Sequence, residues 1–233
     1  MNFTFGIITG GGADSRIQQI VKSIEEENIP DYEIIVVGSC SVSSPHLKVV
    51  SFDESVKQKW ITKKKNIITE QASCENIVYM HDYISLCPGW YEGFLKFGDD
   101  FRACMTRMIN MDGSRYRDWT LWAEDNPSAG HDLLLPYTEK GLSRIMYFSG
   151  AYWVAKKSLM QEYPLNESLT WGFGEDVEWS KRVRERYPFA MNAESTVTLL
   201  IYHHPIFRDA SEEYLKTARN RLGIMSAPGD GER

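Results

Sequence analysis

The 233-residue sequence predicts a single α/β domain in which helices flank a mixed, mainly parallel β-sheet. Two short apolar runs, at 3–9 and 33–37, are typical of buried strands, and each stops at glycine. Between them lies the i, i+3, i+4, i+7 spacing of a helix with one buried face, carried by Ile17, Ile20, Val21 and Ile24. Such a strand–helix–strand unit crosses over right-handedly, which places its two strands parallel in one sheet.

The remaining elements follow from the same two periodicities. We expect strands at 47–52, 76–80, 101–109, 145–154 (with a break at Ser149-Gly150) and 197–202. We expect helices at 57–72, 90–97, 175–187 and 212–222. Residues 110–145 have weak periodicity, which predicts either a long ordered loop or two short helices. The polar segment 226–233 is expected to be a mobile tail.

Composition and charge restrict the function classes. The formal net charge is −6 and the pI about 5.5, which disfavours a broad nucleic-acid-binding face and predicts no nucleic-acid partner. No apolar stretch approaches the ~18 residues of a transmembrane helix, and the N-terminal residues lack the basic region of a secretion signal. The four cysteines are widely spaced and form no C-x-x-C pair, so zinc-ribbon and thioredoxin-like sites are not expected. We therefore expect a reduced, cytoplasmic protein.

Four predicted strand ends carry loops able to contact a ligand, and in open α/β sheets ligands bind at this carboxyl edge. The loops are Thr9-Gly10-Gly11, Gly38-Ser39, His81-Asp82-Tyr83 and His203-His204. The first is not a dinucleotide fingerprint, because G-x-G-x-x-G needs a glycine or alanine where Ser15 stands. The second strand ends at Gly38, where a ribose-binding acid would be required. A nicotinamide cofactor is therefore disfavoured.

Several segments occur in a characteristic order. Residues 36–41 read VVGSCS, Lys65-Asn66 precedes a buried strand, and residues 79–90 read YMHDYISLCPGW. Further along come S-G-A at 149–151, P-L-N-E at 164–167 and W-G-F-G-E-D at 171–176. With these segments the chain resembles family 2 glycosyltransferases of the GT-A fold over most of its length. VVGSCS stands where that family usually has V-D-D-G-S, and the match is strongest from 149 to 176.

The resemblance implies a nucleotide-sugar-dependent enzyme of the hexosyltransferase type, of the kind used in polysaccharide biosynthesis. It implies that residues 1–104 bind the nucleotide sugar, and that residues 105–225 shape the acceptor site and carry the catalytic base. The expected reaction is transfer of a sugar from a UDP- or GDP-sugar to a hydroxyl of a glycan or other acceptor.

By the same resemblance, Asp176 is the general base that deprotonates the acceptor hydroxyl, and one direct displacement would invert the anomeric centre. Glu175 is expected to contact the acceptor sugar or to brace the site, because adjacent helical side chains diverge by about 100°. Outside the W-G-x-G context, these two acids would be an ordinary pair favoured by a helix N-terminus.

Binding roles also come from the resemblance. The expected nucleotide-sugar contacts are Thr9, Gly10, Gly11, Gly38, Ser39, Lys65, Asn66, His81, Asp82 and Tyr83. The expected acceptor contacts are Gly150, Trp171 and Gly172. Lys63 and Lys64 are expected to lie on a solvated helix face.

The metal motif departs from the family pattern. Aligned on P-G-W, His81 and Tyr83 fall on the two aspartates of D-x-D, and Asp82 falls between them. Mn²⁺ and Mg²⁺ prefer oxygen ligands, so neutral Tyr83 is a poor substitute for the usual carboxylate. Asp82 with help from His203 or His204 is one hypothesis. The others are a cation bound mainly through the diphosphate, and a metal-independent enzyme. The two histidines are equally consistent with a strand-end pair that bonds backbone.

Two other functions stay open. A nucleotide-sugar-binding module that has lost catalysis is suggested by Tyr83 and by the absence of an acid at Gly38-Ser39. A sugar-phosphate nucleotidyltransferase of related architecture would need a basic residue near the first glycine loop, and Arg16 follows that loop.

Overall fold

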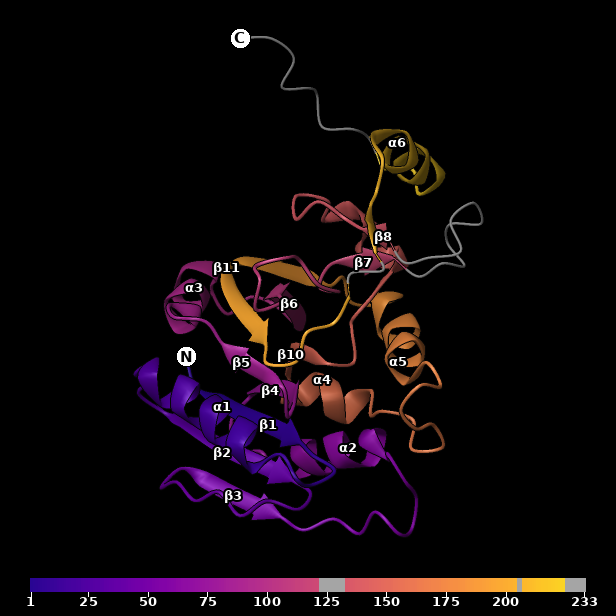
Figure 1. Ribbon diagram of the computed structural model, residues 1–233. Helices are drawn as coiled ribbons and strands as arrows, with labels where there is room; N and C mark the ends of the chain where they lie inside the picture. Colours follow the sequence, from indigo (N-terminus) through magenta and orange to yellow (C-terminus); the bar gives the residue numbers. More distant parts are fainter. Residues whose placement is uncertain (122–132, 205–206, 225–233) are drawn as a thin grey trace.

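The computed structural model describes residues 1–121, 133–204 and 207–224, and its main feature is a curled eight-stranded sheet with helices packed against it (Figure 1). The strand order is β3-β2-β1-β4-β10-β6-β11-β5. In chain order these strands are β1 (Phe3–Ile8), β2 (Tyr32–Val37), β3 (Leu47–Val50), β4 (Asn76–His81), β5 (Ile84–Leu86), β6 (Ala103–Ile109), β10 (Tyr152–Lys156) and β11 (Ala190–Leu199). The α-helices are α1 (Asp14–Glu26), α2 (Ile61–Gln71), α3 (Trp90–Phe97), α4 (Lys157–Glu162), α5 (Glu175–Arg184) and α6 (Glu212–Arg221). The tail predicted at 226–233 lies outside the described residues.

The first four strands form a parallel set in which the strand order reverses. α1 leads from β1 to β2, whereas α2 leads from β3 back across the sheet to β4. Right-handed crossovers in opposite directions place their helices on opposite faces of a sheet. Ile8, the last residue of β1, pairs with Val37 of β2 and His81 of β4. The loops that follow these strands therefore emerge together, at the point where the order reverses.

The two faces of β1 show why the core can form on both sides of the sheet. Side chains alternate along a strand, so Phe3 and Phe5 share one face, where their rings pack 5.1 and 5.5 Å from that of Trp90 in α3. Gly6 lies on the other face, against α2. A Cβ atom on Gly6 would lie 2.3 Å from the Ile68 side chain, so the close packing of α2 on β1 requires glycine there.

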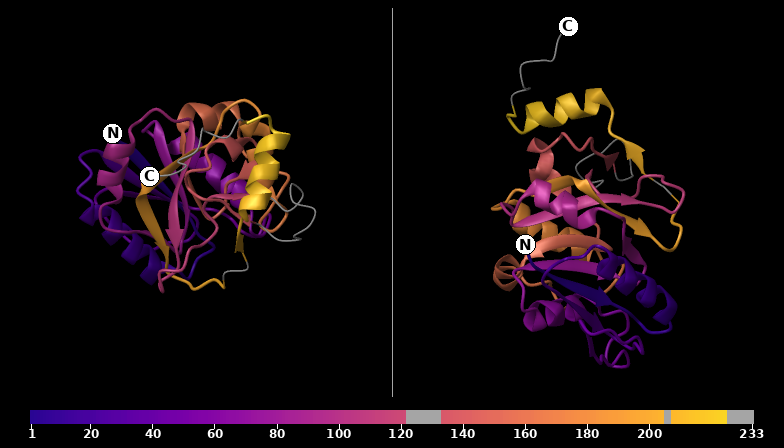
Figure 2. Two further views of the ribbon diagram at one scale, coloured as in Figure 1. Left: turned by 90° about the horizontal axis from the view of Figure 1, so that it is seen from above. Right: turned by 90° about the vertical axis from the view of Figure 1, so that its left-hand side faces the viewer.

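The second half of the chain completes the sheet with mixed pairings. β10 is antiparallel to both β4 and β6, β11 is parallel to β6, and β5 is antiparallel to β11. A small second sheet has the order β12-β8-β7-β9. With α6 it lies at the end of the molecule remote from α1 (Figure 2). Its strands are β7 (Thr120–Leu121), β8 (Leu133–Leu134), β9 (Met146–Tyr147) and β12 (Arg208–Asp209).

The mixed, mainly parallel α/β architecture is confirmed, and most differences from expectation fall in the second half. The strand expected at 197–202 begins at Ala190 and ends at Leu199. Its first part has no apolar run because buried Asn192 and Ser195 satisfy each other, the Asn192 amide donating to the Ser195 hydroxyl over 2.9 Å. The segment expected as one strand at 145–154 is divided into β9 and β10 by the turn at Ser149-Gly150.

The described part of the weakly periodic region contains neither of the two arrangements expected for it. In its described part, residues 110–145 hold the short strands β7 and β8 and a 3₁₀ helix, η2 (Gly141–Ile145). The strand β5 and the helix α4 were not expected, because elements of this length leave little periodicity in a sequence. Across the described ranges, the structure contains no helix that is long and apolar enough to cross a membrane.

Candidate functional site

A cleft of about 660 Å³ opens where β1 and β4 end. The carboxyl edge of parallel strands at a reversal of strand order is the general ligand position in open α/β sheets. The cleft brings together the whole of one predicted loop, His81-Asp82-Tyr83, two residues of another, Thr9 and Gly10, and one residue of a third, His203. Its lining residues are Ile8, Thr9, Gly10, Glu54, Ser55, Gln58, Lys59, Ile61, Lys64, His81, Asp82, Tyr83, Trp171 and His203.

Gly38 follows β2 at this edge of the sheet and packs against Thr9, but it does not line the cleft. Its φ is +137°, and a Cβ atom there would lie 2.2 Å from the Thr9 carbonyl oxygen. Only glycine therefore lets the end of β2 approach the end of β1 this closely. Ser39 is exposed and lies beside the first loop, 3.4 Å from where a Cβ on Gly11 would be.

Asp82 is held by neighbours on two sides. The Thr9 hydroxyl donates to Asp82 Oδ2 over 2.6 Å and accepts a hydrogen bond from the Gly11 amide over 3.1 Å. The Arg16 guanidinium lies 3.7 Å from Asp82 Oδ1, and its Nε donates to the Asp82 carbonyl over 3.1 Å. Arg16 thus supplies the positive charge next to this carboxylate.

Lys63 and Lys64, adjacent residues of α2, lie in different environments. Lys64 is 2% exposed and lines the cleft, where its Nζ donates to the Thr9 carbonyl over 2.6 Å and pairs with Glu54. The expectation that Lys64 lies on a solvated face is therefore wrong, because the spacing of Ile61, Lys64 and Ile68 places Lys64 on the buried side of the helix. Lys63 is part-exposed, in agreement with its expected place.

Lys65 lies behind the cleft in a second charged cluster. It is 1% exposed, and its Nζ donates to the Gly150 carbonyl over 2.6 Å and lies 4.3 Å from the centre of the Trp153 ring. Burial lowers the pKa of Lys65 to about 8, against the opposing charges of Glu175 and Asp176. Lys65 does not line the cleft.

The predicted catalytic acids, Glu175 and Asp176, both lie against the turn at Gly150. Asp176 Oδ2 accepts a hydrogen bond from the Gly150 amide over 2.8 Å. A Cβ on Gly150 would lie 3.1 Å from Glu175 Oε1 and 3.2 Å from Asp176 Oδ2, so glycine lets both carboxylates approach the backbone. Burial raises the pKa of Glu175, and the negative charge of Asp176 raises it further.

Three aromatic rings line one wall of the cleft. The Tyr83 ring lies between those of His81 and His203, at centroid distances of 5.3 and 5.5 Å. Burial, then the charges of Lys65 and Lys64, lower the pKa of His81 well below its usual value. Burial raises the pKa of Tyr83, so at neutral pH both side chains are uncharged. The Nε2 atoms of His81 and His203 are buried and have no hydrogen-bond partner among the described residues.

The remaining predicted residues divide between the cleft and other places. Trp171 lines the cleft with its side chain 53% exposed, and Lys59 Nζ lies 4.6 Å above its ring. Gly172 follows it with φ of +86°, which favours glycine. Asn66 does not line the cleft and instead bonds the Leu165 backbone and the Glu167 carboxylate. His204 is exposed and does not line the cleft.

The donors present do not fit a cation site built by the protein. The described ranges contain no group of three or more histidine, cysteine, aspartate or glutamate side chains that could hold a metal ion. Asp82 already faces Arg16 and Thr9, and Tyr83 is a protonated phenol where a carboxylate would be needed. The pairing of Asp82 with His203 or His204 as metal ligands stays a prediction.

Sequence reasoning missed five polar cleft residues, which are Glu54, Ser55, Gln58, Lys59 and Lys64. The helical spacing described above could have shown that Lys64 is buried, but not that it lines the cleft. The helix expected from residue 57 begins at Ile61, and tertiary packing brings the irregular segment 54–59 to the cleft.

No family model matches the chain, and no curated protein matches it. Solved structures do. A crystal structure of GalNAc-T7 with UDP, GalNAc and Mn²⁺ has a TM-score of 0.65 at 14% identity, covering 96% of this chain and 48% of that one. S. aureus TarS in complex with UDP-GlcNAc has a TM-score of 0.56 at 14% identity, covering 93% and 61%. S. aureus TarS in complex with UDP has a TM-score of 0.55 at 14% identity, covering 96% and 65%.

This likeness confirms the GT-A fold that the sequence resemblance implied. The chain spans less than two thirds of the length of each of these neighbours. Membership of family 2 in particular stays a prediction.

Proposed function

We propose that this protein transfers a sugar from a UDP- or GDP-sugar to a hydroxyl of a glycan or other acceptor. The observation that carries the proposal is the cleft at the ends of β1 and β4, in the fold of proteins solved with UDP or UDP-GlcNAc. Two lysines, Lys59 and Lys64, line it and would face a diphosphate, and Trp171 offers a ring to a sugar.

In this proposal Asp176 takes the proton of the acceptor hydroxyl. The acceptor oxygen then forms a bond to the anomeric carbon while the bond from that carbon to the diphosphate breaks, and the nucleoside diphosphate leaves with the electron pair. One such displacement inverts the anomeric centre. Lys64 would take up charge on the leaving group, which requires the diphosphate to displace Glu54 from its ammonium.

Asp176→Asn tests the role of the base. The amide oxygen retains an acceptor for the Gly150 amide, so the turn should keep its geometry. We expect isothermal titration to give unchanged affinity for UDP or GDP, and turnover of the nucleotide sugar to fall by roughly 10²–10⁴-fold. Wild-type turnover in the variant, or a product with the donor's own anomeric configuration, would contradict the proposal.

A second candidate is a nucleotide-sugar-binding module without catalysis. It is favoured by the Asp82 carboxylate, which faces Arg16 rather than an open position. This candidate predicts nucleotide binding by the wild-type protein with no turnover of any donor and acceptor pair. The nucleotidyltransferase alternative predicts pyrophosphate release from UTP or GTP and a sugar phosphate.

A further inference from the structure

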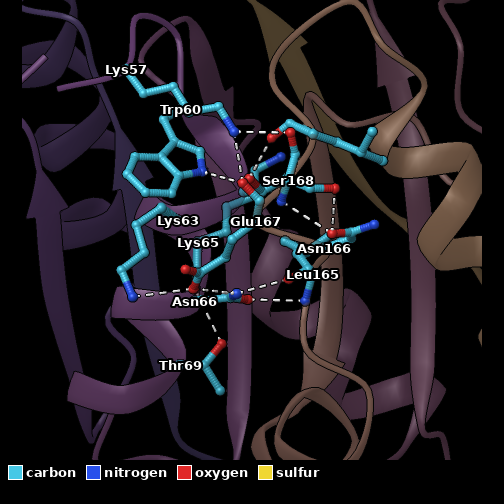
Figure 3. Close-up of polar contacts among 12 residues, drawn as sticks. Lys57, Trp60, Lys63, Lys65, Asn66, Thr69, Leu165, Asn166, Glu167 and Ser168 are labelled. Atoms are coloured by element: carbon cyan, nitrogen blue, oxygen red, sulfur yellow. Dashed lines mark hydrogen bonds and ion pairs between the residues drawn. The ribbon is translucent and has the colours of Figure 1, made fainter. Parts of the chain in front are cut away.

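The segment 165–171 lies within the connection from α4 to α5 and ends at Trp171, and Asn66 of α2 holds its first part (Figure 3). The Asn66 amide nitrogen donates to the Leu165 carbonyl over 2.9 Å and to Glu167 Oε1 over 3.0 Å. The Asn66 side-chain oxygen accepts from the Leu165 amide over 3.0 Å. Asn66 is buried, so these bonds are shielded from water and losing them leaves unpaired polar groups.

Glu167 receives further bonds from the start of α2 and the residues before it. Its carbonyl accepts from Trp60 Nε1 over 2.7 Å and from Lys57 Nζ over 2.8 Å. Its carboxylate pairs with Lys63 over 3.1 Å. Figure 3 shows these side chains converging on Glu167 from one side. The middle of the 165–171 segment is therefore held through both its backbone and its side chain.

The end of the segment reaches the cleft through Lys59. The Trp171 amide donates to the Lys59 carbonyl over 3.1 Å, and the Lys59 ammonium lies above the Trp171 ring. Both residues line the cleft. The stretch that lines one side of the cleft and the stretch that holds the 165–171 segment are thus one continuous piece of chain.

One face of α2 contacts the 165–171 segment and another lines the cleft. Lys63 and Asn66 are three residues apart and lie on the face toward the segment, whereas Ile61 and Lys64 line the cleft. A ligand that contacts Lys64 therefore acts on the same rigid helix that anchors Glu167.

We propose that Trp60, Lys63 and Asn66 are positioning residues that hold the 165–171 segment, and with it Trp171, at the edge of the cleft, so that a nucleotide bound there restrains this segment. The inference rests on the proposed function, because it requires the cleft to bind a nucleoside diphosphate. In this inference Asn66 positions the acceptor side of the site. From the sequence alone, Asn66 is expected to contact the nucleotide sugar.

Hydrogen-exchange mass spectrometry of the full chain, with and without UDP or GDP, tests the proposal. In the wild-type protein we expect the bound nucleotide to slow exchange in peptides covering 165–171 by about tenfold. Asn66→Ala should lose this slowing while nucleotide affinity, measured by isothermal titration, changes less than about threefold. Trp60→Phe keeps an aromatic ring and loses the bond to the Glu167 carbonyl while the Asn66 bonds remain, so part of the slowing should remain.

Thr69→Val is the matched control on the same helix. It removes the hydrogen bonds of Thr69 to Tyr79 and the Lys65 carbonyl without touching the segment, so nucleotide-dependent slowing should persist. Slowing that survives in Asn66→Ala, or nucleotide binding without any slowing in the wild-type protein, overturns the inference alone. If the wild-type protein binds neither UDP nor GDP, the proposed function and this inference both fail.

Discussion

Two charged clusters in this part of the molecule have similar composition but differ in how deeply they are buried. The rim cluster consists of Thr9, Arg16 and Asp82, and the Arg16 and Asp82 side chains are 33% and 16% exposed. The buried cluster consists of Lys65, Glu175 and Asp176 around Gly150, and Lys65 is 1% exposed. Each combines a cation with carboxylate and a short hydrogen bond.

The difference in depth decides the energetic consequences. Solvent partly screens the part-exposed Arg16–Asp82 pair, and ion pairs near the surface contribute little to stability. In the buried cluster, desolvation lowers the pKa of Lys65 and raises that of Glu175, so both shifts favour the neutral form. The buried cluster is therefore the one whose stability should depend on pH, and the following variants test this contrast.

The largest effect is expected from Lys65. Its pKa falls from 10.5 to about 8 on folding, so between these values the unfolded chain holds a proton that the folded protein has lost. Stability conferred by this site then rises with pH, by about 3 kcal/mol in total from pH 8 to 10.5. Urea unfolding of the wild-type protein and Lys65→Met across this window measures the difference, in which titration of tyrosines common to both proteins cancels. A difference that stays constant with pH would contradict the buried position of Lys65.

Gly150→Ala should have the next largest effect. Its new Cβ would lie 3.1 Å from Glu175 Oε1 and 3.2 Å from Asp176 Oδ2, so the two carboxylates must move. We expect a loss of about 1–3 kcal/mol in the free energy of unfolding, typical of overpacking. Gly10→Ala is the control at the rim, because nothing lies within 4 Å of its Cβ position and its φ is not positive. An equal loss of unfolding free energy in Gly150→Ala and Gly10→Ala would show that the buried cluster is packed no more tightly than the rim.

The smallest effect is expected from Asp82→Asn. The amide oxygen can still accept the Thr9 hydroxyl, and only the charge attraction to Arg16 is lost. The free energy of unfolding should fall by about 1 kcal/mol or less, and by less still at high salt. Urea unfolding at low and high ionic strength checks both statements. A loss of several kcal/mol that salt does not reduce would show that the rim pair behaves as a buried one.

The parallel half could be predicted because its signals are local. The runs at 3–9 and 33–37 and the helix between them are complete within one stretch of chain, and the handedness rule then fixes their arrangement. Thr9 and Asp82 were found for the same reason, since both follow strands that end at one edge. β5 and the first part of β11 were missed, because β5 is three residues long and buried polar Asn192 and Ser195 interrupt the apolar pattern of β11.

By itself, the sequence determined the α/β class, the carboxyl edge where a ligand would bind, and the segments that carry the resemblance to the GT-A fold. Only the tertiary structure decided that Lys64 faces the cleft, that Lys65 lies behind it, and that Asn66 holds the 165–171 segment. These three residues are adjacent on one helix and turn about 100° from one to the next. Their partners, Thr9, Gly150 and Leu165, are 55, 85 and 99 residues away, and no local pattern specifies contacts over that distance.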